Sequence, residues 1–202
     1  MTREQQRQLR KLNQDLPKLL SNNIRPYKLK KRDFMVWGKN KDIYSSLLIG
    51  VKELNGHCYC FSTEWIKPLW IDDLLWDMID MSENKSQPLS LRCIGAFAIH
   101  GATAFEGQQE LFEWSKEELE KCVISYIAHF NDTVNNSNME YYYSVLDPNA
   151  YHGEVQEILL LIYNSEYRKA MERIEALETG GPFCNNGIYF KEYARKYCEE
   201  RM

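Results

Sequence analysis

The chain has 202 residues, of which 44% are hydrophobic and 27% are charged, and these proportions are typical of a globular protein. Its formal net charge of −4 argues against bulk binding to nucleic acid, which normally requires a basic face. No run approaches the roughly 18 uninterrupted apolar residues of a membrane span, so we expect no membrane association. At this length we expect one domain over residues 1–202, with no disulfide, metal or cofactor required for stability.

The chain begins with a predicted amphipathic helix over residues 3–21, in which leucines recur at helical spacing. Pro17 lies within this helix and predicts either a bend or a restart. The segment lacks the apolar region of a signal peptide, so we expect an intracellular, cytoplasmic protein. Its six cysteines are then most simply reduced thiols.

Three short runs rich in aromatic and β-branched residues follow, and they predict antiparallel strands over residues 31–38, 42–54 and 57–66. Asn55-Gly56 is typical of a two-residue turn and predicts a hairpin in which Gly50 pairs with Phe61. The basic run over residues 25–32 favours an edge strand protected by charge. The alternative is contact with phosphate or with an acidic partner.

The periodicity changes again after the hairpin. Residues 70–81 predict a helix, and the apolar run at residues 89–101 predicts a strand near the sheet centre. The clearest helix covers residues 115–136, where Ser115 and Glu118 form a capping box.

From residue 138 onward, three helical segments replace the strands. We therefore predict an α+β fold, with an N-terminal helix and an antiparallel sheet of about four to five strands with helices packed on one face. The sheet-containing part covers about residues 1–137, and a helical C-terminal section covers about residues 138–202.

The stretch closest to a chemical motif is His57-Cys58-Tyr59-Cys60. In the predicted hairpin, Cys58 and Cys60 share one face of the sheet and His57 points to the other. Same-face neighbours on a strand lie about 6.5–7 Å apart, too far for both to enter one tetrahedral zinc shell without a bend. We favour buried packing for both cysteines, and we expect no other cysteine to approach them in a ligand geometry. The alternative is a metal or redox site.

On the predicted helix at residues 70–81, Asp73, Asp77 and Asp80 lie opposite the apolar stripe, with Trp70 and Trp76 near its edges. Like charges at this spacing repel one another. The face is therefore either a solvated surface, a docking face for a protein partner or a divalent-cation site. A single helix cannot supply a closed oxygen shell, so the cation site is the least favoured of the three.

Two further groups are candidates. His100, with Glu106 or Glu110, follows the predicted strand at residues 89–101 and could form a general acid–base pair. The chain contains no G-x-S-x-G, H-E-x-x-H, P-loop or dinucleotide-binding glycine pattern, which weakens the catalytic interpretation. Tyr141 and Tyr142 lie in a turn-rich connector, where they either contribute to a binding surface or pack the helical section on the sheet.

The order of a helix, a basic strand ("KLKKRDFMVW"), a long hairpin and the segment "LSLRCIGAF" resembles bacterial domain-of-unknown-function proteins of small α+β type. Some of these are encoded near toxins and are suspected immunity partners. The resemblance covers about residues 1–135 and implies a non-enzymatic binding role. We therefore predict a cytosolic, non-catalytic protein-binding module, with a small hydrolase-like enzyme that uses the His/Glu pair as the alternative.

Overall fold

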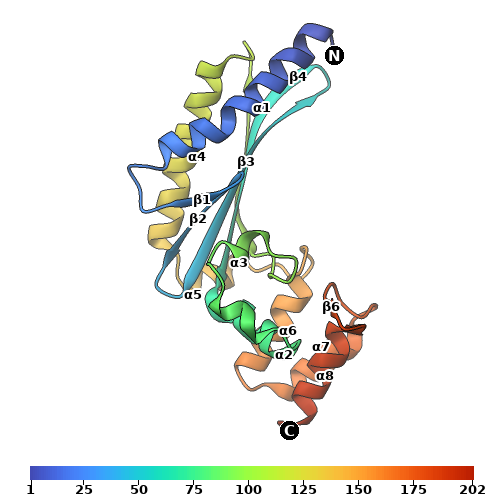
Figure 1. The fold of residues 1–202 in the computed structure, drawn as a ribbon. Helices are drawn as coiled ribbons and strands as arrows, with labels where there is room; N and C mark the ends of the chain where they lie inside the picture. Colours follow the sequence, from blue (N-terminus) through green and yellow to red (C-terminus); the bar gives the residue numbers. More distant parts are fainter. The chain divides into compact units, whose positions relative to one another are not determined.

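A computed structural model describes residues 1–202, apart from the side chain of Ile94. The chain divides into two compact units (Figure 1). Unit 1 comprises Met1–Ile66 and Thr103–Tyr142, and unit 2 comprises Lys67–Ala102 and Tyr143–Met202. The fold is α+β as predicted, with an N-terminal helix, an antiparallel sheet and a helical C-terminal section.

Unit 1 is built on a five-stranded antiparallel sheet whose strands follow one another in chain order. The predicted long hairpin is confirmed, but the strand predicted at residues 31–38 is divided by a turn at Asp33-Phe34 into two paired strands. The basic run ends in the first of these, the edge strand β1. The strands are β1 (Lys30–Arg32), β2 (Met35–Asn40), β3 (Ile43–Leu54), β4 (His57–Pro68) and β5 (Ala102–Leu111).

The turn between β3 and β4 fixes which side chains face the core. Asn55 and Gly56 both have positive φ, 54° and 86°, as a two-residue hairpin turn of this type requires. A Cβ on Gly50 would lie 2.3 Å from the ring of Phe61, which agrees with the predicted pairing of these two residues. Along β4 the burial alternates, because successive side chains of a strand point to opposite faces.

Two long helices cover one face of this sheet. They are α1 (Arg3–Asn23) and α4 (Lys116–Asn136), and Figure 1 shows both beside the strands. α1 is one continuous helix that includes Pro17, so the helix does not restart at this residue. The leucine stripe of α1 packs with β3, β4 and α4 in one hydrophobic core. Burial of such apolar side chains is the main stabilising contribution to the unit.

Unit 2 is mostly helical. Tyr163 at the end of one helix stacks on Trp70 of another, with ring centroids 3.9 Å apart. A small hairpin turns at Asn186-Gly187, and both turn residues have positive φ. The elements of unit 2 are α2 (Leu69–Met78), the 3-10 helix η1 (Ser82–Ser86), α3 (Leu91–Ile94), α6 (Gly153–Tyr163), α7 (Tyr167–Ala176), β6 (Cys184–Asn185), β7 (Ile188–Tyr189) and α8 (Phe190–Glu199), while α5 (Met139–Val145) contains the boundary between the units.

The predicted strand at residues 89–101 is wrong. The segment forms the short helix α3 and a loop, and the next strand begins only at Ala102. Buried side chains take the place of a neighbouring strand. The Lys67 ammonium donates to the carbonyl oxygens of Arg92 and Ile99, and the Trp76 indole donates to that of Phe97. Because these bonds satisfy the backbone of the segment, it needs no sheet partner.

Two further expectations need correction. The stretch that includes Glu106 and Glu110 was expected only to follow a strand, but it itself forms the edge strand β5. The tyrosine-rich connector is partly helical, as α5 shows. None of the helices in the described part of the chain combines the length and the apolar character that crossing a membrane requires.

Candidate functional site

Cations from neighbouring elements, Arg92 of α3 and Lys85 of η1, pair with the predicted acidic face of α2. Asp73 accepts a hydrogen bond of 2.6 Å from the Arg92 guanidinium. Asp77 accepts bonds from Lys85 and from the Ser82 hydroxyl. Although partial burial opposes the effect, these two donors hold the pKa of the Asp77 carboxyl below its usual value. Two of the three predicted carboxylates are therefore already neutralised within the chain.

The two tryptophans of this face lie in different environments. Trp76 is only 1% exposed and donates its indole N–H to the carbonyl oxygen of Phe97 at 2.7 Å. The prediction that Trp76 lies on a binding surface is therefore wrong, because this side chain belongs to the core of unit 2. Trp70 is half-buried against Tyr163, and Asp80 is exposed in a left-handed conformation with φ of 58°.

The two tyrosines predicted for a binding surface, Tyr141 and Tyr142, differ in their exposure to solvent. Tyr142 is fully buried, so its ring packs the structure and is not presented to solvent. Tyr141 is half-buried, and its hydroxyl donates to the carbonyl oxygen of Ala104 on β5. Of the two, only Tyr141 keeps part of its side chain accessible to a partner.

The cysteines of the hairpin are core residues. Cys58 and Cys60 are both fully buried, while His57 is exposed on the opposite face. Cys122 on α4 is the neighbouring cysteine. Its thiol and burial together raise the pKa of Cys60, and burial raises the pKa of Cys58 to about 11. Thiols held protonated in this way are poor nucleophiles and poor metal ligands.

Within the described residues, no group of three or more His, Cys, Asp or Glu side chains is arranged to hold a metal ion. The Glu110 carboxylate instead binds the Nδ1 atom of His57 at 2.6 Å. Glu106 is exposed on β5. His100 is half-buried, and burial lowers its pKa. His100 belongs to unit 2, whereas Glu106 and Glu110 belong to unit 1.

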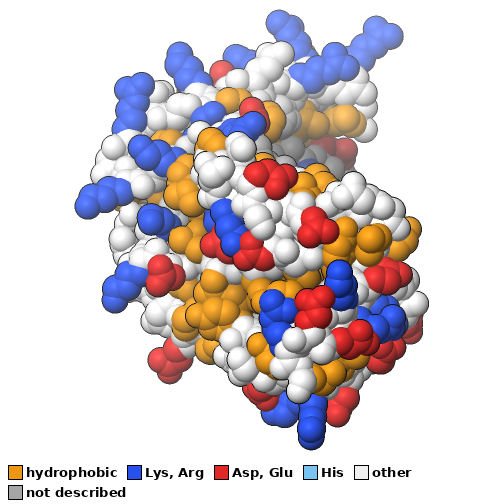
Figure 2. All heavy atoms as spheres, turned by 60° about the horizontal axis from the view of Figure 1, so that its bottom comes forward, with side chains coloured by type: hydrophobic (Ala, Val, Ile, Leu, Met, Phe, Trp, Pro, Cys, Tyr) orange, Lys and Arg blue, Asp and Glu red, His pale blue; other side chains and the backbone are white. Residues whose placement is uncertain are grey.

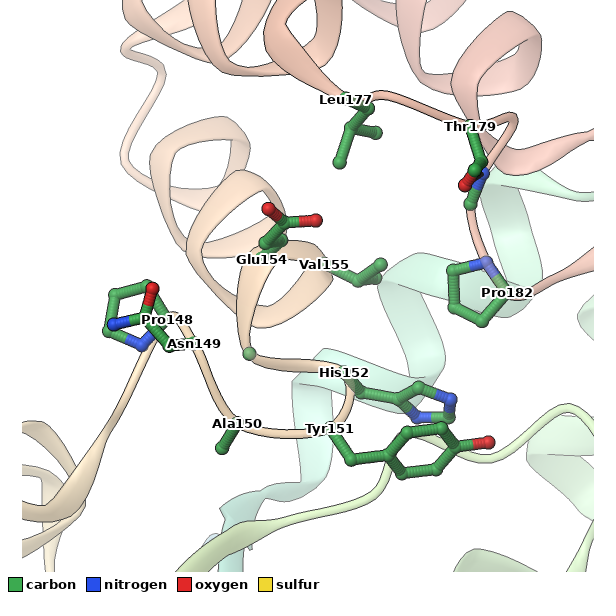
Figure 3. A pocket seen from close by; sticks show the side chains of 12 residues that line it. Pro148, Asn149, Ala150, Tyr151, His152, Glu154, Val155, Leu177, Thr179 and Pro182 are labelled. Atoms are coloured by element: carbon green, nitrogen blue, oxygen red, sulfur yellow. Dashed lines mark hydrogen bonds between the residues drawn. The ribbon is translucent and has the colours of Figure 1, made fainter.

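A hollow in unit 2 lies at the N-terminal end of α6, and its volume is about 510 Å³. This is within the range of about 300–1,000 Å³ that is typical of ligand pockets. Figure 3 shows Tyr151, Glu154 and Val155 on one side and Leu177, Thr179 and Pro182 on the other. We call this the α6 pocket; its remaining lining residues are Pro148, Asn149, Ala150, His152, Gly153 and Gly181.

His152 forms one wall of the α6 pocket and is tightly held. It lies in a left-handed conformation with φ of 64°, immediately before α6. Its ring stacks on Tyr151, with centroids 4.0 Å apart, and its Nδ1 atom accepts the backbone N–H of His100 at 3.0 Å. Gly153 follows, where a Cβ would lie 2.1 Å from the carbonyl oxygen of Asp147, so only glycine fits.

Burial lowers the pKa of His152 to about 4, so its ring is neutral near pH 7. Because Nδ1 accepts the backbone hydrogen bond, Nε2 carries the remaining proton. The ring therefore has no free lone pair with which to act as a base. It can offer a partner one N–H donor and an aromatic face.

Glu154 supplies the only charge among the lining residues of the α6 pocket. It makes no ion pair with any residue that the structure describes; the neighbouring Arg173 pairs with Glu157 instead. Tyr151 at the rim is 70% exposed. A pocket lined by an unpaired carboxylate and an exposed aromatic ring suits a cationic side chain, which can gain from either group.

Sequence reasoning missed two buried polar clusters. In unit 1 the fully buried Glu64 accepts bonds from Thr133 at 2.6 Å and from Nδ1 of His129 at 2.8 Å. Burial raises the pKa of Glu64, while these two donors oppose the rise. In unit 2 the buried ammonium of Lys67 lies 2.8 Å from the carboxylate of Asp72. A signal for Glu64 was present, because it lies on the same face of β4 as the buried cysteines.

Comparison of the chain with models of protein families, with curated proteins and with solved structures finds no match.

Proposed function

We propose that the chain is a non-catalytic protein-binding module, and that unit 2 receives a basic segment of a partner protein. The observation that carries this proposal is the α6 pocket, whose lining includes both the unpaired Glu154 and the exposed ring of Tyr151. A lysine or arginine of a partner would pair with the carboxylate and lie over the ring.

The charge of unit 2 supports the same type of partner. This unit contains fifteen Asp and Glu residues against ten Lys and Arg residues. An excess of acidic side chains attracts a basic partner during diffusion and raises the rate of association. The pocket then supplies the anchoring contact, which at protein interfaces contributes far more than the contacts at the rim.

The pocket does not favour an enzyme. His152 has its Nδ1 lone pair engaged and stays neutral, and Glu110, one of the two glutamates predicted to assist His100, is hydrogen-bonded to His57. A general base needs a free lone pair within reach of its substrate. Binding therefore remains the better supported of the two predicted functions.

A pull-down from the source cells tests the proposal. Tagged wild-type chain is compared with Glu154→Gln and Tyr151→Ala, and Phe112→Ala serves as the control because Phe112 is 77% exposed in unit 1. We expect a stoichiometric partner with the wild type and the control, and a loss of about tenfold or more with the two pocket variants, as for an anchoring residue. Equal recovery with all four proteins, or no stoichiometric partner, would count against the proposal.

The specific form of binding that we propose is neutralisation of a toxic protein, as in an immunity protein. Co-expression of the chain with a toxin-like product of a neighbouring gene tests this form. Wild-type chain should restore growth and Glu154→Gln should not, while Phe112→Ala restores growth like the wild type. Restoration by Glu154→Gln would show that protection does not depend on the pocket.

A further inference from the structure

The net charge of the chain conceals a strong asymmetry. Residues 1–41 contain twelve Lys and Arg against three Asp and Glu, a net charge of +9. Residues 42–202 contain thirteen basic and twenty-six acidic residues, a net charge of −13. The overall value of −4 argues against binding to nucleic acid only if charge is spread evenly, and here it is not.

Most cations of the N-terminal segment are exposed and make no ion pair with a described residue, in contrast to many of those between residues 57 and 201. Repulsion among unpaired cations is relieved when an anion binds. Figure 2 shows Lys and Arg side chains projecting along the upper edge of the molecule. Ten exposed cations make no ion pair with a described residue: Arg3, Arg7, Arg10, Lys11, Lys18, Arg25, Lys28, Lys30, Lys39 and Lys41.

Helix α1 gathers part of this charge on one surface hollow, which contains no carboxylate. At about 1.5 Å per residue, the hollow extends about 16 Å along the helix axis. One strand of duplex DNA presents about five phosphates over that length. We call this surface the basic face of α1, and its lining residues are Arg3, Gln6, Arg7, Arg10, Lys11 and Gln14.

The adjoining flank of α1 differs. There a groove shared with the start of α4 contains Glu4, Asp15, Glu113 and Glu117, and Arg7 and Lys11 lie on the border between this groove and the basic face. Carboxylates on that flank repel phosphate. A polyanion is therefore directed to the basic face, where only cations and amides lie.

The burial of α1 argues against a membrane as the partner. A helix that binds a bilayer surface must insert its apolar side. The apolar stripe of α1, which includes Leu12, Leu16 and Leu19, is packed in the core of unit 1 and is not available for insertion. The exposed amides of Gln6 and Gln14 instead suit hydrogen bonds to phosphate and sugar oxygens.

We propose that unit 1 binds nucleic acid through the basic face of α1, which contacts the phosphate backbone and reads no sequence. This binding involves another unit and another class of ligand than the α6 pocket, so each proposal can fail without the other. A phosphate-dominated contact predicts affinity that falls steeply with salt and depends little on base sequence.

Fluorescence anisotropy with labelled duplex DNA, single-stranded DNA and single-stranded RNA of random sequence tests this inference. The full-length wild type is compared with the variant Arg3→Gln/Arg7→Gln/Arg10→Gln/Lys11→Gln. The control is Arg168→Gln/Lys169→Gln/Lys196→Gln/Arg201→Gln, which changes the net charge by the same amount at exposed positions of unit 2. Circular dichroism verifies that both variants are folded.

We expect the α1 variant to lose binding and the control to keep it. If the wild type contacts about six phosphates of duplex DNA, its affinity falls about 10³-fold between about 50 and about 200 mM salt. With four of those contacts removed, the fall is only about tenfold.

Three results would overturn the inference. They are the absence of binding by the wild type to all three nucleic acids at low salt, an equal loss in both variants, and binding to anionic vesicles but to no nucleic acid. Sedimentation of the proteins without nucleic acid tests the remaining alternative, in which a second copy of the chain occupies the basic face. If the α1 variant differs from the wild type only in self-association, the basic face binds the acidic surface of a second copy instead.

Discussion

Replacing Lys67 by methionine should destabilise unit 2 more than any exposed substitution. Lys67 is 3% exposed, and its ammonium group donates to the Asp72 carboxylate at 2.9 Å and to the carbonyl oxygens of Arg92 at 2.7 Å and Ile99 at 2.5 Å. Methionine fills a similar volume and donates no hydrogen bond. The variant therefore leaves a buried carboxylate and two carbonyl oxygens without their donor.

The size of this destabilisation depends on the hydrogen bonds that Asp72 keeps in the variant. Asp72 keeps the backbone N–H of Ile99 at 2.8 Å and a long bond of 3.3 Å from Arg92. Removing one partner from a buried ion pair costs about 3–5 kcal/mol, since the other charge stays buried. We expect the free energy of unfolding to fall by that amount. At a slope of about 2 kcal/mol/M, the urea midpoint falls by roughly 1.5–2.5 M.

Urea denaturation followed by circular dichroism measures this change. The control is Lys169→Met, which removes an exposed ion pair with Glu166 and should leave the urea midpoint almost unchanged. A double-mutant cycle with Asp72→Asn should give a coupling of more than about 1 kcal/mol, because the two side chains are in contact. A loss of under about 1 kcal/mol in Lys67→Met would refute the reasoning.

Two further predictions concern His152 and Gly50. Because the pKa of folded His152, about 4, lies below its unfolded value of 6.5, the unfolded chain binds more protons between these values, and stability falls as the pH drops through this window. Between about pH 7 and about pH 5, the free energy of unfolding of the wild type should fall by about 2 kcal/mol more than that of His152→Asn. Asparagine keeps a hydrogen-bond acceptor and tolerates the left-handed backbone. Parallel pH profiles of unfolding for the two proteins would contradict this prediction. Gly50→Ala should cost about 1–3 kcal/mol, since the new Cβ would lie 2.3 Å from the Phe61 ring. In a Phe61→Ala background that cost should vanish, and thermal unfolding that shows additive effects would disprove the contact as its cause.

The parts of the fold that were predictable are those fixed by local sequence. Asn55-Gly56 sets the register of the long hairpin, and this register decides which side chains of β4 are buried. The same rule applies at Asn186-Gly187, where a second hairpin was overlooked because we predicted only helical segments after residue 138. Both turns depend on residues that adopt positive φ at little cost, so their signal is local.

The failures have a common physical cause. The segment at residues 89–101 is apolar enough for a central strand, yet its backbone is satisfied by Lys67, Asp72 and Trp76. These donors and acceptors lie some twenty residues or more away from the groups that they bind. Propensity and periodicity do not register partners at such distances, so tertiary contacts override the local preference.

The same limit explains the acidic face of α2. The helical spacing placed Asp73 and Asp77 correctly on one side of the helix. It could not show that Arg92 and Lys85 return to neutralise them, or that the Arg92 guanidinium covers the ring of Trp76 at 4.8 Å. Helical periodicity fixes the direction of a side chain but not what it meets there.

Glu64 shows how far the reasoning could have gone. The alternation that predicts burial for Cys58 and Cys60 extends to Glu64, and a carboxylate predicted to be buried requires a donor. The helix at residues 115–136 was predicted to pack on the sheet, and it contains His129 and Thr133 one turn apart. Burial and the need for a partner were therefore readable from the sequence. Which residues of α4 meet that need depends on the axial position of the helix on the sheet, and only the folded structure provides it.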